Sequence, residues 1–299
     1  MHGVLNYITW GGAEGINLGF FTIHYYSLMW IMAFLVGWFI MAKMFRIDGI
    51  PKEKLDPLFM YTFLGAILGA RLGEFLFYDP SAFIERPIEV FLPVQYSPGS
   101  STLFGLLDNY EFVGFQGLAS HGATIGLIIS SYLFVRNHLP QKSLWWLLDR
   151  LAITVALGGS FVRIGNFINS EIIGKPSDLP WAVLFVNQSS GYGEVVPRHP
   201  AQLYEAFGYV LLFGLLWFIY TKTNKKFYNG YILGVFFIIL FGIRFVVEFF
   251  KEDQGVEWVA QTLNMNLNNG QLLSIPFILI GVFLIMTSKN RYVHEKNTL

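Results

Sequence analysis

The sequence predicts an all-α integral membrane protein with about seven transmembrane helices, and three observations support this fold class. Hydrophobic residues make up 54% of the 299 positions. Charged residues make up only 13%, about half of their usual share in soluble domains. Seven windows each contain the run of about 20 mostly apolar residues that a helix needs to cross the hydrocarbon core of a bilayer.

The predicted helices follow one another along most of the chain. Several contain glycines, which let membrane helices approach each other closely. Their approximate ranges are 21–42, 57–78, 113–135, 144–166, 203–220, 230–250 and 271–288. No repeat, low-complexity tract or soluble domain interrupts this pattern, so we expect a single transmembrane domain over residues 1–299.

Lysines and arginines between the predicted helices are unequally distributed, and cytoplasmic loops are enriched in these residues. One side of the membrane has twelve of them: Lys43, Arg46, Lys52, Lys54, Arg136, Lys142, Lys222, Lys225, Lys226, Lys289, Arg291 and Lys296. The other side has four: Arg86, Lys175, Arg198 and Lys251. The sequence therefore predicts an N-terminus outside and a cytoplasmic C-terminus. The long connections, about 79–112, 167–202 and 251–270, then face outward, and long loops on one face often carry function.

Four arginines lie inside the predicted spans, where a charged side chain costs a few kcal/mol and indicates a functional site. Arg71, Arg163 and Arg244 are expected near the outer ends of their helices. Arg150, beside Asp149, is expected near an inner end and is excluded from the group. A guanidinium stays charged and binds anionic oxygens in a forked geometry. Arginines at this depth therefore predict a phosphate site, most simply for a phospholipid headgroup.

Other polar side chains are expected at the same level. At 1.5 Å per residue, His121 lies only about 12 Å below the outer end of its helix. His24 and Tyr26 lie near the outer end of the first helix, and Asn166 lies near the outer end of the fourth. Histidine is the residue best suited to move a proton near neutral pH.

Each of these residues also has a purely structural interpretation. Arg71 and Arg244 could form ion pairs with Glu74 and Glu248 that only hold helices together. His121 could be a hydrogen-bonded packing residue, and the tyrosine of the first helix could belong to an interfacial aromatic belt. The convergence of all of them at one depth favours a site.

Several kinds of chemistry are disfavoured. The chain has no cysteine, which excludes disulfides, thiolate metal sites and a cysteine nucleophile. The patterns GxSxG, HExxH and Walker A are absent, which argues against a hydrolase or an ATPase. No carboxylates or histidines occur at metal-ligand spacing, and a net charge of zero does not indicate nucleic acid. We therefore expect no metal, no cofactor and no nucleic-acid partner.

One run of residues resembles a known signature. From Arg163 to Gly174 the sequence reads RIGNFINSEIIG, at the predicted exit of a helix. It resembles the signature R-x-G-N-F-x-N-x-E-x-x-G of the prolipoprotein diacylglyceryl transferases at every fixed position. Ser120–Gly122, Arg198–Glu205 and Gly242–Phe249 resemble the same family, so the resemblance spans most of the chain.

This resemblance implies an enzyme that transfers the diacylglyceryl group of phosphatidylglycerol to the lipobox cysteine of prolipoproteins and releases glycerol phosphate, the first step of bacterial lipoprotein maturation. It implies a multi-pass protein of the bacterial cytoplasmic (inner) membrane, with an active site toward the outer leaflet. The expected partners are phosphatidylglycerol, prolipoprotein signal peptides and membrane lipid. A transporter or flippase for an anionic lipid is the alternative, although the spans show no inverted repeat. A structural or receptor-like protein would leave the clustered arginines unexplained.

The resemblance and the charge pattern together predict roles for individual residues. We expect His121, Arg163 and Arg244 to be catalytic: His121 would deprotonate the substrate thiol, and the two arginines would hold the phosphate. Glu171 and Glu248 are expected to orient those arginines, and Gly174 to permit a tight loop over the headgroup. The expected substrate-binding residues are Tyr26, Arg71, Asn166, Asn169, Glu171, Gly174, His199 and Glu248.

Overall fold

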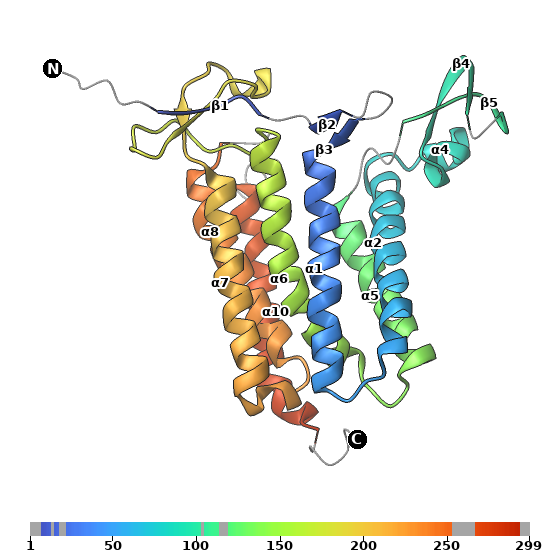
Figure 1. The fold of residues 1–299 in the computed structure, drawn as a ribbon, viewed down its shortest axis with the longest axis vertical. Helices are drawn as coiled ribbons and strands as arrows, with labels where there is room; N and C mark the ends of the chain where they lie inside the picture. Colours follow the sequence, from blue (N-terminus) through green and yellow to red (C-terminus); the bar gives the residue numbers. More distant parts are fainter. Residues whose placement is uncertain are drawn as a thin grey trace. The chain divides into compact units, whose positions relative to one another are not determined.

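A helix lies in each of the seven predicted windows of the computed structural model, which describes residues 7–12, 15–17, 22–102, 105–113, 119–252 and 267–293 (Figure 1). The helices are α1 (Tyr25–Ile47), α2 (Leu55–Tyr78), α5 (Ser120–His138), α6 (Leu144–Ile168), α7 (Ala201–Lys222), α8 (Tyr231–Val247) and α10 (Asn269–Thr287). The predicted all-α membrane fold class is confirmed.

The predicted number of seven membrane spans is supported for six helices. Six helices in the described part of the chain are long and apolar enough to cross a membrane, and α5 is not among them. The physical reason is its composition, because polar residues such as Ser120, His121, Ser130 and Ser131 interrupt its 19 residues. A seventh span and the orientation of the termini stay predictions.

The chain forms two compact units. Unit 1 consists of Met1–Gly49 and Leu148–Leu299, and contains α1, α7, α8, α10 and most of α6. Unit 2 consists of Ile50–Leu147 and contains α2, α5 and the connection between them. The expected single catalytic domain over residues 1–299 stays a prediction.

Unit 1 is a helix bundle with small strands at one end (Figure 1). Strand β1 (Ile8–Trp10) pairs in parallel with β6 (Val183–Phe185), and β6 pairs antiparallel with β7 (Pro197–Arg198). Strands β2 (Gly15–Asn17) and β3 (Thr22–His24) form an antiparallel hairpin directly before α1. These strands lie at the end of the bundle where α6 ends and where α1 and α7 begin.

A small apolar core anchors the chain that follows α6. Ile173 is fully buried together with Val183 and Phe185 of β6, and Trp10 and Phe167 pack against them. Burial of this cluster fixes the position of the segment that contains the signature run, because apolar burial is the main stabilising contribution available to a short loop.

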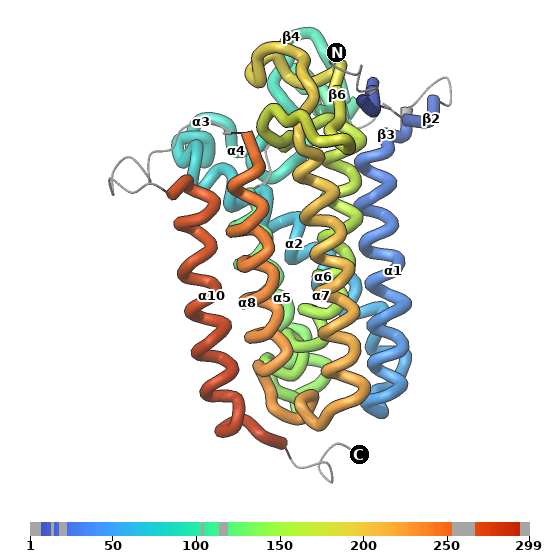
Figure 2. The backbone as a smooth tube through the Cα atoms, turned by 90° about the vertical axis from the view of Figure 1, so that its left-hand side faces the viewer, coloured from blue at the N-terminus to red at the C-terminus, as the bar shows by residue number. Residues whose placement is uncertain are grey.

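Helix α8 packs against both α7 and α10 (Figure 2). Gly234 of α8 and Gly281 of α10 face each other so closely that a Cβ atom on Gly281 would lie 2.7 Å from the Gly234 carbonyl oxygen. Glycine at both positions therefore permits close contact between the two helices, as is common in membrane proteins.

The other end of unit 1 contains a buried carboxylate that joins two helices. Asp149 of α6 accepts hydrogen bonds from the backbone N–H groups of Gly230 (2.7 Å) and Leu233 (2.8 Å). These donors at the start of α8 have no partner within their own helix. Arg150 forms an ion pair with Asp48 (Nε–Oδ2 2.9 Å) at this end of α6, far along the helix from Arg163.

Unit 2 is built on the antiparallel pair α2 and α5. Gly69 of α2 lies against Gly122 and Gly126 of α5, where a Cβ atom on Gly69 would be 2.8 Å from the Gly126 Cα. Gly73 and Gly122 approach each other in the same way, with 2.6 Å from a Cβ on Gly73 to the Gly122 Cα. The glycines of these two predicted windows thus serve close helix packing.

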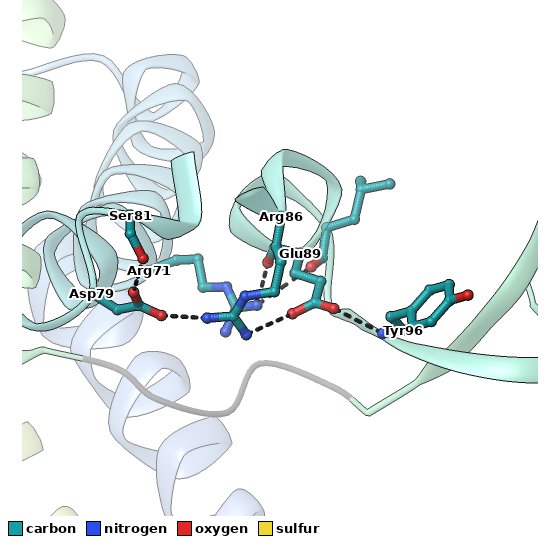
Figure 3. Close-up of polar contacts among 7 residues, drawn as sticks. Arg71, Asp79, Ser81, Arg86, Glu89 and Tyr96 are labelled. Carbon is teal, nitrogen blue, oxygen red and sulfur yellow. Dashed lines mark hydrogen bonds and ion pairs between the residues drawn. The ribbon is translucent and has the colours of Figure 1, made fainter. Parts of the chain in front are cut away.

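The connection between α2 and α5 has a structure of its own. It contains the short helices α3 (Ala82–Glu85) and α4 (Pro87–Phe91) and the antiparallel strands β4 (Val94–Thr102) and β5 (Leu107–Phe112). Arg71 of α2 donates from Nη2 to the carbonyl oxygens of Glu89 (2.5 Å) and Leu92 (3.4 Å), as Figure 3 shows. The Glu89 carboxylate accepts hydrogen bonds from Tyr96 N (2.8 Å) and Arg86 Nη1 (3.2 Å). The connection is therefore bonded to α2 rather than extending freely from it.

Candidate active site

The signature run begins in the last turns of α6 and continues into the following loop. Arg163 donates from Nη1 to Asn166 Oδ1 (3.1 Å), and Asn166 donates from Nδ2 to Glu171 Oε2 (3.1 Å). Asn169 donates to the other carboxylate oxygen of Glu171, also at 3.1 Å. Both asparagines of the signature therefore hold one carboxylate, and Asn166 connects it to Arg163.

The backbone around Glu171 has an unusual conformation. Ser170 and Ile172 have φ values of 56° and 57°, in the left-handed region that a β-branched residue rarely adopts. Gln202 of α7 donates to the Glu171 carbonyl oxygen (2.6 Å) and supports this turn from the neighbouring helix. Such strain persists only where the surroundings determine it, and it is often found at functional sites.

Arg163 is paired with a carboxylate that we did not assign from the sequence. Its Nε lies 2.6 Å from Oε2 of Glu205, a residue of α7 whose side chain is 0% exposed. The other oxygen of Glu205 accepts from Nζ of Lys251 (2.9 Å), which also binds Glu248 Oε2 (3.1 Å). The order of contacts is thus Arg163, Glu205, Lys251 and Glu248, across α6, α7 and the end of α8.

The sequence contains a signal for Glu205 and a weaker one for Lys251. Glu205 is the last residue of the stretch Arg198–Glu205 that resembles the family, and it is a carboxylate inside a predicted span. Such a residue requires a buried cation as partner. Lys251 was counted among the loop cations, although its side chain is only 5% exposed.

Arg244 differs from Arg163 in its surroundings. Among the described residues it forms no ion pair, and its buried Nε has no hydrogen-bond partner. Its Cζ lies 5.8 Å from the ring centre of Phe241. The structural alternative for Arg244, an ion pair with Glu248, is therefore wrong for this structure, because Glu248 binds Lys251 instead.

The expected orienting carboxylates also need correction. Glu171 is held by two asparagines and Glu248 by a lysine, so neither forms an ion pair with an arginine among the described residues. The carboxylate that contacts Arg163 directly is Glu205, whereas Glu171 is connected to Arg163 through Asn166. Within the described part of the chain the two arginines therefore differ: Arg163 has a carboxylate partner and Arg244 has none.

Tyr26 lies beside the signature run. A Cβ atom on Gly165 would be 2.8 Å from Cδ2 of Tyr26, so the tyrosine ring packs directly on the glycine of α6. Tyr26 lies close enough to Arg163 to interact with it electrostatically, as does Tyr209 of α7. The start of α1 thus contributes to the same group of residues.

Gly174 and His199 lie in adjacent backbone segments. Gly174 N donates to the His199 carbonyl oxygen (3.0 Å), and a Cβ on Gly174 would lie 2.5 Å from the Cβ of His199. Gly174 therefore permits a close contact between two loops. The His199 imidazole bonds to the Tyr204 hydroxyl (Nδ1–Oη 3.1 Å), and burial lowers its pKa, which favours the neutral ring near neutral pH.

The two remaining candidates belong to unit 2. His121, at the start of α5, is exposed, and its ring contacts Phe77 and Tyr78 of α2 with ring centres 4.7 Å and 5.7 Å apart. Arg71 is buried and bonds to the carbonyl oxygens of the connection described above. The expected meeting of these two residues with those of unit 1 stays a prediction.

Comparison with known proteins identifies the family. The family model for prolipoprotein diacylglyceryl transferase matches residues 14–287. This chain belongs to the prolipoprotein diacylglyceryl transferase family. The resemblance predicted from the sequence is confirmed, and with it a transferase of lipoprotein biosynthesis that is built as a multi-pass membrane protein.

Relatives support this membership over nearly the whole chain. A phosphatidylglycerol–prolipoprotein diacylglyceryl transferase of Bacteroides fragilis is 39% identical over 284 residues, which cover 95% of this chain and 96% of the relative. The enzyme of the same name from Tolumonas auensis is 38% identical and covers 91% and 94% of the two chains. The one from Chloroherpeton thalassium is 35% identical and covers 98% of each.

Proposed function

We propose that this prolipoprotein diacylglyceryl transferase family member transfers the diacylglyceryl group of phosphatidylglycerol to the lipobox cysteine of prolipoproteins. The relatives' names give the substrates, and the charge arrangement of unit 1 suits the lipid. The proposed location is the bacterial cytoplasmic (inner) membrane, with the active site facing the outer leaflet and the prolipoprotein bound through its signal peptide.

The observation that carries the proposal is the state of Arg244. Glu205 and Glu248 already bind the cations Arg163 and Lys251, whereas Arg244 forms no ion pair among the described residues. A buried or half-buried cation without a partner is costly, and binding an anion would remove this cost. A lipid phosphate is the anion that a guanidinium binds best in forked geometry.

The reaction needs a thiol that this chain does not have. The prolipoprotein cysteine, with an unperturbed pKa of about 8.5, loses its proton to a base. The sulfur then attacks the glyceryl carbon bonded to the phosphate oxygen. A thioether bond forms, that carbon–oxygen bond breaks, and glycerol phosphate leaves with the bonding electrons. The base passes this proton to the departing glycerol phosphate or to water, so it is deprotonated again before the next turnover.

The residues have the following proposed roles. His121 is the base, and Arg244 and Arg163 bind the phosphate and stabilise the charge that develops as it leaves. Tyr26, Asn166 and Asn169 would contact the headgroup, and Glu171, Gly174 and His199 would shape the loop beside it. The hydrogen bonds of Arg71 to the connection between α2 and α5 favour a structural role for this residue over lipid binding.

A single experiment separates this function from lipid transport. The purified protein is incubated with phosphatidylglycerol and a lipobox peptide, and the peptide is analysed by mass spectrometry. The proposal expects a peptide heavier by one diacylglyceryl group, and none when the peptide cysteine is replaced by serine. Movement of phosphatidylglycerol between leaflets with an unmodified peptide would instead establish a flippase.

A further inference from the structure

The charge pattern of the sequence predicts Lys251 among the four cations of the outward side, and its side chain is buried between two carboxylates. Its Nζ lies 2.9 Å from Glu205 Oε1 and 3.1 Å from Glu248 Oε2. Its own backbone is fixed by the signature loop: residue 251 forms a bridge with Gly174, and Phe250 O accepts from Lys175 N at 2.8 Å. On the other side, Glu252 N donates to Ile173 O at 3.1 Å.

The helix geometry explains why Glu248 binds Lys251 rather than Arg244. In a continuing α-helix, residues 244 and 248 would be neighbours on one face. However, α8 ends at Val247, and Glu248–Phe250 forms a 3-10 turn. Residues three apart eclipse one another in a 3-10 turn, which places Glu248 beside Lys251. The Glu248 carboxylate also lies on Gly270 of α10, where a Cβ atom would be 2.8 Å from Oε2.

We infer that Lys251 is a positioning residue of the transferase that keeps Arg244 available for the lipid phosphate by binding the Glu248 carboxylate. The inference rests on the proposed function. Without the lysine charge, Glu248 would lose the one cation that it binds among the described residues, and Arg244 would be the nearest alternative along the chain. An Arg244–Glu248 pair would then compete with the phosphate for the same guanidinium.

A double-mutant cycle tests this inference. Lys251→Met is first compared with the parent protein. The double variant Lys251→Met/Glu248→Gln is then compared with Glu248→Gln alone, in which the carboxylate that could reach Arg244 is replaced by a neutral amide. Coupled neighbours give non-additive effects. We expect Lys251→Met to raise the KM for phosphatidylglycerol by about tenfold or more when Glu248 is present, with a smaller change in kcat. In the Glu248→Gln background we expect a change of less than about threefold.

Lys251→Arg is the matched control, because it keeps the charge and should retain most of the activity. A merely structural lysine would give the same loss in both backgrounds and an equal fall in melting temperature, and that result would overturn the inference.

Retention of phosphatidylglycerol in native mass spectrometry provides a readout that does not need turnover. If retention follows the predicted pattern while no variant, including the parent, modifies the peptide, then the proposed function fails and the role of Lys251 stands.

Discussion

Arg163 and Arg244 illustrate how a single contact changes the role of a side chain. Arg163 has Glu205 at 2.6 Å, so its charge is balanced before any lipid arrives. Arg244 has no such partner among the described residues. An arginine that is already paired mainly fixes geometry, whereas an unpaired one gains the full interaction with an incoming anion.

Arg244→Ala is therefore expected to lower kcat/KM by about 100-fold or more, in the range seen when a donor to developing charge is removed. Transfer to a lipobox peptide at varied phosphatidylglycerol concentration measures this effect. Arg46→Ala is the control, because Arg46 is an exposed residue of α1 outside the site and its loss should leave transfer unchanged. Near-normal transfer by a folded Arg244→Ala protein would disprove the phosphate role.

His121 can be tested through the pH dependence of the reaction. If its imidazole accepts the thiol proton, kcat/KM of the parent should fall as pH drops and the ring becomes protonated. His121→Asn should reduce the rate and remove this acidic limb. An unchanged profile in the variant would mean that another group takes the proton.

Arg71 is one of the residues that hold the connection between α2 and α5 in place. Arg71 reaches two carbonyl oxygens at the end of α4, and the Glu89 carboxylate then holds the start of β4 through Tyr96 N (Figure 3). Buried Phe75 of α2 packs against Ala82 and Val90 of the same connection. The polar and apolar contacts together hold α3 and α4 beside the last turns of α2.

Arg71→Met tests whether this residue is structural or binds lipid. Loss of charge-assisted hydrogen bonds should destabilise the protein by about 2 kcal/mol and lower its melting temperature, while the KM for phosphatidylglycerol in the folded fraction stays close to that of the parent. Thermal unfolding in detergent and transfer kinetics supply both numbers. A raised KM for phosphatidylglycerol with an unchanged melting temperature would show instead that Arg71 binds the lipid.

Helices were easier to predict than contacts between them. Each of the seven apolar windows contains a helix, because a backbone in lipid satisfies its polar groups by helical hydrogen bonding. The helix bounds differ from the windows, since Thr22–His24 forms β3 and α5 begins at Ser120. The partner of Glu248 was predicted wrongly because the i, i+4 rule assumes a continuous α-helix. The 3-10 turn after Val247 leads into backbone contacts with Gly174 and Lys175, which are distant in the sequence and which a local spacing rule does not include. Glu205 was missed because its two cations come from other parts of the chain.

At the scale of the whole molecule, the orientation predicted from the loop cations can be measured without altering any native thiol, because the sequence contains no cysteine. Ser190→Cys and Asn224→Cys place single thiols at exposed positions near opposite ends of unit 1. An N-terminus outside predicts that a membrane-impermeant maleimide labels position 190 in intact cells and labels position 224 only after lysis. The reverse pattern would invert the proposed topology.

A buried carboxylate far from the site links the two helices that carry Arg163 and Arg244. Asp149 joins α6 to the start of α8, about 21 Å along α6 from Arg163 and, from Leu233, about 16 Å along α8 from Arg244, at 1.5 Å per residue. A sliding of either helix at this joint would shift one guanidinium relative to the other. Asp149→Asn, which keeps the shape but weakens the joint, is therefore expected to lower kcat by about tenfold without touching any substrate atom. Single-turnover rates of the folded fraction measure this effect. An unchanged rate would show that packing alone keeps α6 and α8 aligned.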